Sequence, residues 1–253
     1  MLTHPTLEKL KGMKLTGMVH GLEDQLQMSD VESLGFEERL GLLVDREETE
    51  RATRRLKSRL TKAKLRQAAC IEDIDYRTRR GLDKATMASL SSCQWIAKHH
   101  NLFVTGPTGV GKTFVACALA QKACREGYSA LYLRLPRLFQ SLAIAKGDGR
   151  YHKLLAGYNR TDVLVLDDWG LSPLGPENCR DLLEILDDRY ASRSTLITSQ
   201  LPVDKWYEYL DDPTLADAIL DRVVHNAYKI ELKGESMRKQ KGDLTKTANT
   251  GTR

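Results

Sequence analysis

The stretch GPTGVGKT, residues 106–113, contains residue types that can hold a phosphate. Glycines let backbone N–H groups turn toward an anion without obstruction by a Cβ atom. An apolar run precedes the stretch and a helical pattern follows it, which is the strand–loop–helix context of a P-loop. The start of that helix adds partial positive charge. The sequence therefore predicts nucleotide binding by Gly106, Pro107, Thr108, Gly109, Val110, Gly111, Lys112 and Thr113.

Two residues of this loop should contact the distal phosphates and a metal ion. Lys112 is expected to reach the β and γ phosphates as a catalytic cation, and the Thr113 hydroxyl to ligate Mg²⁺. A further ligand follows in VLVLDDWG, where four apolar residues place Asp167 at the carboxyl end of a buried strand. From that position Asp167 can hold Mg²⁺ through water. ATP and Mg²⁺ are the predicted cofactors.

Two more polar positions could act on the attacking water. In ATPases with an added catalytic acid, the position of Asp168 polarises that water. A solvated loop carboxylate or a helix N-cap are the other interpretations of Asp168. The strand STLITSQ ends in polar residues, and in the same class it lies between the P-loop strand and the Asp167 strand. Gln200, or Ser199, would then face the γ-phosphate, although TSQ alone also fits an ordinary loop.

Short apolar strands and helical patterns alternate around these motifs. The strands are continuous apolar runs, which are typical of a parallel sheet covered on both faces. Right-handed crossovers then give a five-stranded parallel α/β sheet with helices on both faces. We expect strands at 101–106, 129–135, 162–168, 194–200 and 227–232, and helices at 112–126, 136–145, 150–158, 176–191 and 213–225.

The chain divides into four zones by pattern and composition. Residues 1–68 show helical periodicity interrupted by glycines and predict a small all-α domain that binds DNA or a partner and ends in one long helix. Residues 69–99 read as a polar connector, and residues 100–238 as the ATPase domain. Residues 239–253 carry no apolar face and are expected to be disordered.

Composition excludes several other classes of protein. The 253 residues contain no apolar stretch of the ~20 residues that span a bilayer, and the N-terminus lacks a signal-peptide core, so we expect a cytoplasmic protein without membrane contact. The five cysteines form no CxxC pair, which favours reduced thiols over disulfides or zinc ligands. The histidines also show no ligand spacing.

Basic residues are unevenly distributed, although the net charge is only +5. Eight lie between Arg51 and Arg66 without an acidic residue, and four more follow from Arg77 to Lys84. Such an excess predicts a polyanion partner, and the lack of a dense aromatic platform favours double-stranded over single-stranded DNA. A second group has tyrosines interleaved and reads either as a DNA contact or as a solvated helix face. The predicted DNA contacts are Arg54, Arg55, Arg59 and Lys62, then Lys146, Arg150 and Lys153.

Taken together, four stretches resemble the IstB family of AAA+ ATPases, the helpers of bacterial insertion-sequence transposases. They are NLFVTGPTGVGKTFVACALA, LVLDDWGL, STLITSQLP and LADAILDRVVHNAYKIELKGESMRK. The DnaC helicase loaders are similar but less close. The resemblance implies ATP-driven self-assembly into a homo-oligomer on DNA, bending or remodelling of that DNA, and recruitment of a cognate transposase. It also implies that residues 136–160 form an extra helical element along DNA.

The same resemblance assigns Arg222 a role that its surroundings alone do not. Arg222 lies on an apolar helical pattern, where it could bridge to Asp217, Asp221 or another carboxylate, or reach a neighbouring protomer's γ-phosphate as an arginine finger. The family match favours the finger. The sequence departs from the family pattern at Asp168, usually Glu, at Gln200, usually Asn, and in lacking a full helical lid domain. Arg238 is then either a shortened second sensor or without a role.

Two other functions share part of these motifs. A replicative helicase loader would have every motif but would bind a hexameric helicase and single-stranded DNA. A small-molecule P-loop kinase is disfavoured by the paired Asp167 and Asp168, by the polar strand end and by the basic helix.

Overall fold

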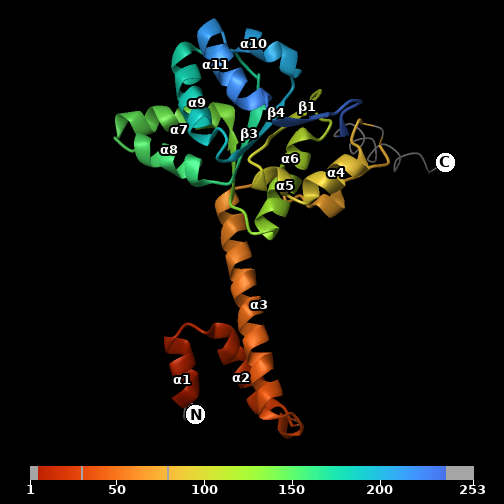
Figure 1. The fold of residues 1–253 in the computed structure, drawn as a ribbon, viewed down its shortest axis with the longest axis vertical. Helices are drawn as coiled ribbons and strands as arrows, with labels where there is room; N and C mark the ends of the chain where they lie inside the picture. The colour runs from red at the N-terminus through yellow and green to blue at the C-terminus, as the bar shows by residue number, and fades with distance from the viewer. Residues whose placement is uncertain (1–4, 30, 79, 238–253) are drawn as a thin grey trace, which may run out of the picture. The chain divides into compact units, whose positions relative to one another are not determined.

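The computed structural model describes residues 5–29, 31–78 and 80–237. The chain forms two compact units, Met1–Ser58 and Arg59–Arg253. Helix α3 (Phe36–Ala63) is the predicted long helix, and it begins in the first unit and ends in the second (Figure 1). No helix among the described residues is long and apolar enough to cross a membrane. The tail predicted at 239–253 lies outside the described residues.

The first unit consists of α1 (Pro5–Gly12), α2 (Thr16–Gln27), η1 (Val31–Ser33) and most of α3. Gly17 is in close contact with α3, because a Cβ there would lie 2.5 Å from the Glu47 Cα. The buried Glu47 carboxylate accepts hydrogen bonds from the N–H groups of Gly17 (2.7 Å) and Met18 (3.2 Å), donors that a helix start leaves unpaired. The hydrogen bond from the Arg51 side chain, and then those from the two backbone N–H groups, lower the pKa of Glu47. Gly17 is therefore a packing residue rather than a helix break.

The second unit is built on a parallel sheet with the strand order β2-β3-β4-β1-β5. Strand β4 lies between β1 and β3, so the segments that follow these three strands meet at one edge of the sheet. The predicted five-stranded parallel α/β class is confirmed. Its strands are β1 (Asn101–Thr105), β2 (Ala130–Arg134), β3 (Val163–Trp169), β4 (Ser194–Ser199) and β5 (Ala227–Glu231).

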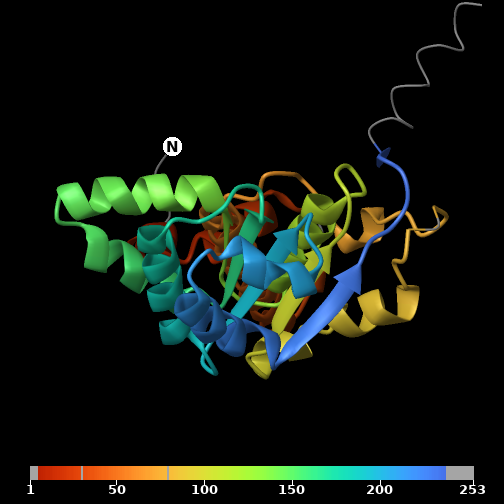
Figure 2. The same ribbon diagram turned by 90° about the horizontal axis from the view of Figure 1, so that it is seen from above.

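Helices cover both faces of this sheet (Figure 1 and Figure 2). Helix α6 (Lys112–Arg125) packs on one face, against β1 to β4. On the other face, α7 and α8 pack on each other and on α9. The helices of that face are α7 (Leu135–Gly147), α8 (Tyr151–Arg160), α9 (Pro176–Arg189), α10 (Trp206–Tyr209) and α11 (Pro213–Val224).

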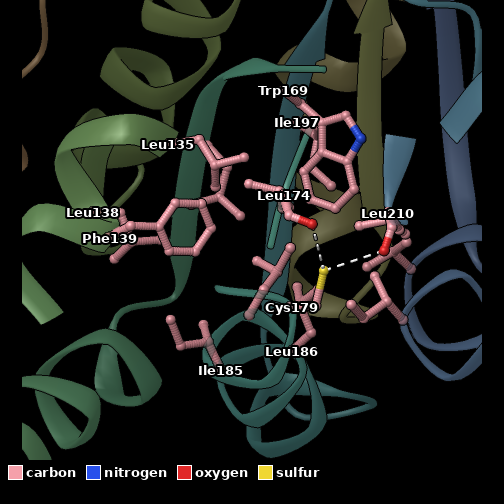
Figure 3. Packing of buried hydrophobic residues seen from close by; sticks show 14 of the residues in the cluster. Leu135, Leu138, Phe139, Trp169, Leu174, Cys179, Ile185, Leu186, Ile197 and Leu210 are labelled. Atoms are coloured by element: carbon pink, nitrogen blue, oxygen red, sulfur yellow. Dashed lines mark hydrogen bonds between the residues drawn. The ribbon is translucent and has the colours of Figure 1, made fainter. Parts of the chain in front are cut away.

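The apolar core beneath these helices fixes their position on the sheet. Alternate strand residues such as Phe103, Leu166 and Ile197 pack against buried side chains of α7 to α11. Figure 3 shows the part of this core around Cys179, whose thiol donates to the carbonyls of Leu174 (3.7 Å) and Leu210 (3.3 Å). The cysteines are free thiols, as their spacing predicts.

The segment expected as a polar connector is folded into the second unit. It contains η2 (Ile71–Asp73), α4 (Lys84–Ser91) and α5 (Gln94–Ala97). The Trp95 indole is buried and donates to the Leu90 carbonyl at 3.1 Å. The Ser194 hydroxyl, at the start of β4, donates to the Trp95 carbonyl at 3.4 Å. These contacts make the segment part of the wall around the sheet.

Candidate nucleotide-binding site

The loop that follows β1 has the backbone that a P-loop requires. Gly106, Gly109 and Gly111 have φ angles of +139°, +87° and +99°, a region that side chains disfavour. The space beside them is filled by the chain itself. A Cβ would lie 2.1 Å from the Leu232 carbonyl at Gly106 and 2.6 Å from Arg80 Nη1 at Gly111. These glycines therefore allow close packing behind the loop as well as access for an anion in front of it.

The loop lines a cavity of about 490 Å³, within the size range of small-molecule sites. Lys112, Thr113, Asp167, Asp168 and Gln200 all line it, so the structure brings the predicted phosphate, metal and water-activating residues together. Thr108, Gly109 and Gly111 complete the loop side of the cavity.

The remaining loop residues support Lys112 and the loop backbone. The Lys112 ammonium donates to the carbonyls of Gly106 (2.7 Å) and Pro107 (2.8 Å). The Val110 side chain is buried, and the Val110 backbone carbonyl accepts a hydrogen bond from Arg80. The Lys112 cation is thus held within the loop that would surround a phosphate chain.

Asp167 is buried at the end of β3 and is held by hydroxyl groups. The Thr113 hydroxyl lies 3.1 Å from both carboxylate oxygens, and the hydroxyls of Thr198 and Tyr132 each donate to one of them. A hydroxyl beside a buried carboxylate is the oxygen donor set that Mg²⁺ prefers, so Thr113 and Asp167 fit the predicted metal site. The described residues contain no cluster of three or more His, Cys, Asp or Glu side chains suited to a metal.

Asp168 stands at an irregularity in β3. Pairing with β4 shifts register between Leu166 and Trp169, as expected for a bulge, and Asp168 has a φ of +66°. Such backbone is disfavoured for most residues but is several-fold enriched in Asp. The Arg134 guanidinium at the end of β2 donates to the Asp168 carboxylate at 2.7 Å. Asp168 is therefore an ion-paired residue of the cavity wall.

Gln200 follows β4 and contacts the P-loop. Its side-chain carbonyl accepts a hydrogen bond from the Thr108 hydroxyl at 2.7 Å. The alternative residue, Ser199, is buried and donates its hydroxyl to the Trp169 carbonyl at 2.9 Å. Of the two candidates, Gln200 has the side chain in direct contact with the phosphate-binding loop.

Sequence reasoning missed four residues of the site. Tyr132 and Arg134 come from β2, whose polar carboxyl end follows the same rule that located Asp167. Arg66 counted only as part of a basic run, yet its guanidinium lies 3.6 Å from Asp167 and binds Tyr132, which raises the pKa of Arg66. Arg80 counted only among the four basic residues from Arg77 to Lys84, but it is buried beside the loop. No local pattern indicates that a distant segment folds back onto a P-loop.

Arg222 lies away from this cavity in its own chain. The Asn101 amide, at the start of β1, donates to the backbone carbonyls of Arg222 (3.4 Å) and Val223 (3.1 Å). The P-loop follows the opposite end of β1. The Arg222 side chain binds Asp187 and the Ala218 carbonyl. Arg238, the other arginine considered as a sensor, lies outside the described residues.

The predicted DNA contacts on α3 are mostly exposed. Arg54, Arg55 and Lys62 are exposed, and none forms an ion pair within the described part of the chain. Arg54 donates to the Thr16 hydroxyl at 2.9 Å. Arg59 is half-buried and donates to the Cys124 carbonyl at 3.4 Å, so part of its hydrogen-bonding capacity is already used.

The second predicted patch is largely neutralised by carboxylates. Lys146 lies 2.7 Å from the buried Asp181 and 2.9 Å from Glu177, and both raise its pKa. Arg150 is ion-paired with Asp148. Lys153 is exposed. The carboxylates of α9 thus attach α7 to the core and reduce the positive charge of this surface.

Comparison with known proteins agrees with this geometry. The chain is 54% identical over 239 residues to the insertion sequence ATP-binding protein y4pL of Sinorhizobium fredii, covering 94% of this chain and 98% of the relative. It is 32% identical to the ATP-binding protein of insertion sequence IS21 from Pseudomonas aeruginosa, covering 94% and 91%. Among solved structures, DnaI shares 25% identity with a TM-score of 0.55, covering 67% of this chain and 90% of DnaI. The DnaC helicase loader shares 17% identity and has a TM-score of 0.54, covering 65% and 97%, which shows the shared fold.

The family described as IstB-like ATP binding protein matches residues 8–245, a span that includes the P-loop, both aspartates and most of the helical N-terminal part. This chain belongs to that family.

Proposed function

We propose that the chain is an ATP-hydrolysing helper of transposition that assembles on double-stranded DNA and recruits a transposase. The proposal of ATP hydrolysis rests on one observation: a single cavity is lined by Lys112, Thr113, Asp167, Asp168 and Gln200. The relatives named as insertion-sequence ATP-binding proteins support the role in transposition.

The site residues suggest a division of labour in ATP hydrolysis. Lys112 would bind the β and γ phosphates, and Thr113 and Asp167 would hold Mg²⁺, which neutralises charge on the phosphate oxygens. Asp168 lines the cavity and would accept a proton from the attacking water. Arg134 orients that carboxylate from β2. Gln200, fixed by Thr108, would direct the water toward the γ-phosphate.

The exposed cations of α3 support DNA binding. They lie on one helix, and no carboxylate of the described residues pairs with Arg54, Arg55 or Lys62. Contacts between such side chains and phosphates release counterions and carry no base information. The neutralised Lys146 and Arg150 offer less charge to a phosphate backbone. We therefore assign most of the DNA affinity to α3.

Removing the charge of Arg54, Arg55 and Lys62 by substitution with Gln should weaken duplex binding and flatten its salt dependence. The slope of log K against log salt should fall by roughly one for each phosphate that the variant no longer neutralises. Arg59 is left in place because it hydrogen-bonds Cys124. Fluorescence anisotropy with a labelled duplex measures both quantities.

The matched control replaces Lys146, Arg150 and Lys153 with Gln, which should change the slope less. An unchanged slope and affinity in the α3 variant would make that helix a solvated face or a protein-docking surface. A larger effect of the control variant would assign DNA binding to α7 and α8 instead.

The partner can be tested directly against the helicase-loader alternative. With ATP and duplex DNA, the tagged chain should retain the transposase encoded by the neighbouring reading frame and should not retain the host replicative helicase. We expect this because an insertion-sequence relative matches 94% of this chain in sequence, whereas the DnaC loader resembles it only in fold. Retention of the helicase on single-stranded DNA, without the transposase, would favour the loader function.

A further inference from the structure

Arg80 lies in the segment between α3 and α4, and its backbone is fixed beside the end of β5. Its carbonyl accepts a hydrogen bond from the Lys233 N–H at 2.8 Å. The next residue, Gly81, has a φ of +75°, and a Cβ there would lie 2.6 Å from the Glu231 carbonyl. The backbone from which the Arg80 side chain starts is therefore held against the residues at and just after the end of β5.

The Arg80 guanidinium connects two distant segments. The residue is 5% exposed, and it donates to the Val110 carbonyl of the P-loop (3.0 Å) and to the Asp75 carbonyl (3.1 Å). Its Nε atom has no hydrogen-bond partner. Within the part of the chain that the structure describes, no carboxylate forms an ion pair with it. Burial lowers the pKa of Arg80, an effect that the nearby charge of Asp75 opposes only in part, and burial of a charge without an ion pair is energetically unfavourable.

The contact with Val110 bears directly on the anion-binding backbone. The Val110 carbonyl and the Gly111 N–H belong to one trans peptide plane, so they point in opposite directions. Holding the carbonyl toward Arg80 directs the Gly111 N–H to the other side of the loop. Gly111 itself leaves room for the guanidinium, since a Cβ there would lie 2.6 Å from Arg80 Nη1. Arg80 and Gly111 line the same cavity.

We propose that Arg80 is a positioning residue for the nucleoside triphosphate: it holds the Val110–Gly111 peptide in its anion-binding orientation, and its buried charge offsets the charge of the phosphates. This proposal rests on nucleotide binding by the P-loop. The guanidinium acts through the loop rather than on the reacting atoms. Its loss should therefore weaken nucleotide affinity and leave the rate of the chemical step nearly unchanged.

The test compares Arg80→Met, Arg80→Lys and, as a matched control, Arg77→Met, which removes an exposed arginine of the same segment. Arg80→Met should bind ATP about tenfold more weakly, the size expected for losing hydrogen bonds to a charged group. Arg80→Lys keeps the charge but cannot bind both carbonyls with one planar group. Its affinity for ATP should therefore lie between those of the parent and of Arg80→Met. Titration with ATP and with ADP measures the affinities. The variants should lose more affinity for ATP than for ADP.

Three further measurements separate positioning from a merely structural role. The KM for ATP should rise in Arg80→Met while kcat stays within about twofold, because uniform binding has been lost. Thermal melting without nucleotide checks that each variant is folded. In the unaltered chain, ATP should slow amide exchange in residues 75–78, 80 and 81 together with the P-loop, a measurement that requires no variant to fold.

Several outcomes would overturn the proposal. Folded Arg80→Lys and Arg80→Met chains that bind ATP as the parent does would remove any positioning role. A lower kcat at unchanged KM, or ATP-independent exchange at residues 75–78, 80 and 81, would contradict it as well. A parent chain that itself fails to bind ATP would instead refute the proposed function.

Discussion

Substitution of Lys112 by Ala should abolish tight ATP binding, whereas Asp168→Asn should keep binding and lose hydrolysis. Lys112 is the cation held within the phosphate loop, so its loss removes charge that both ground state and transition state use. As the proposed general base, Asp168 would accept a proton only during turnover, and loss of such a base slows the chemical step by about a hundredfold or more. Nucleotide titration and single-turnover hydrolysis measure the two effects separately.

The choice of Asn at position 168 makes this comparison sharp. Asn tolerates the left-handed backbone that Asp168 adopts and has nearly the same size, so the variant changes the charge and not the bulge. Because the product state is not reached, Asp168→Asn should also hold a stable ATP-state assembly on DNA. Hydrolysis at the parent rate by Asp168→Asn would assign activation of the water to another residue.

The arrangement of the sheet and the centre of the site could be predicted from local sequence. Continuous apolar runs located the strands, and polar residues at their carboxyl ends located Asp167 and Gln200. The carboxyl ends of parallel strands lie at one edge, so these residues had to converge once the strand order was fixed. The order itself, with β4 between β1 and β3, came from the ATPase class rather than from the pattern.

The outer wall of the site could not be predicted in this way. Arg66 and Arg80 reach the cavity only because the segment before β1 folds back onto the P-loop, and no periodicity encodes that contact. The register shift that places Asp168 likewise depends on pairing between two strands. This register shift also offers a reason why position 168 is Asp where the family pattern has Glu, since Asp168 has a positive φ and Asp is among the residues that best tolerate it.

Hydrolysis by this chain is expected to require two protomers, because Arg222 cannot serve the pocket of its own chain. The Arg222 carbonyl lies beside the start of β1, and the P-loop follows the end of that five-residue strand, roughly 16 Å away along the sheet. That separation exceeds the reach of an arginine side chain. A protomer arranged head-to-tail with its neighbour could instead bring Arg222 to the neighbouring γ-phosphate.

Mixing two inactive variants tests this arrangement. Arg222→Ala keeps a complete P-loop but offers its neighbour no arginine, and Lys112→Ala has a defective pocket but still offers Arg222. Each alone should be nearly inactive, since an arginine supplied in trans contributes roughly 10³–10⁵ in rate in known cases. At equal amounts on DNA, about one interface in four joins an intact pocket to an intact Arg222 in a head-to-tail assembly, so activity should return toward a quarter of the parent rate. Arg180→Ala, which removes an exposed arginine of α9, should be active without mixing. If Arg222 serves only its ion pair with Asp187, no ratio of the two folded, co-assembling variants restores hydrolysis.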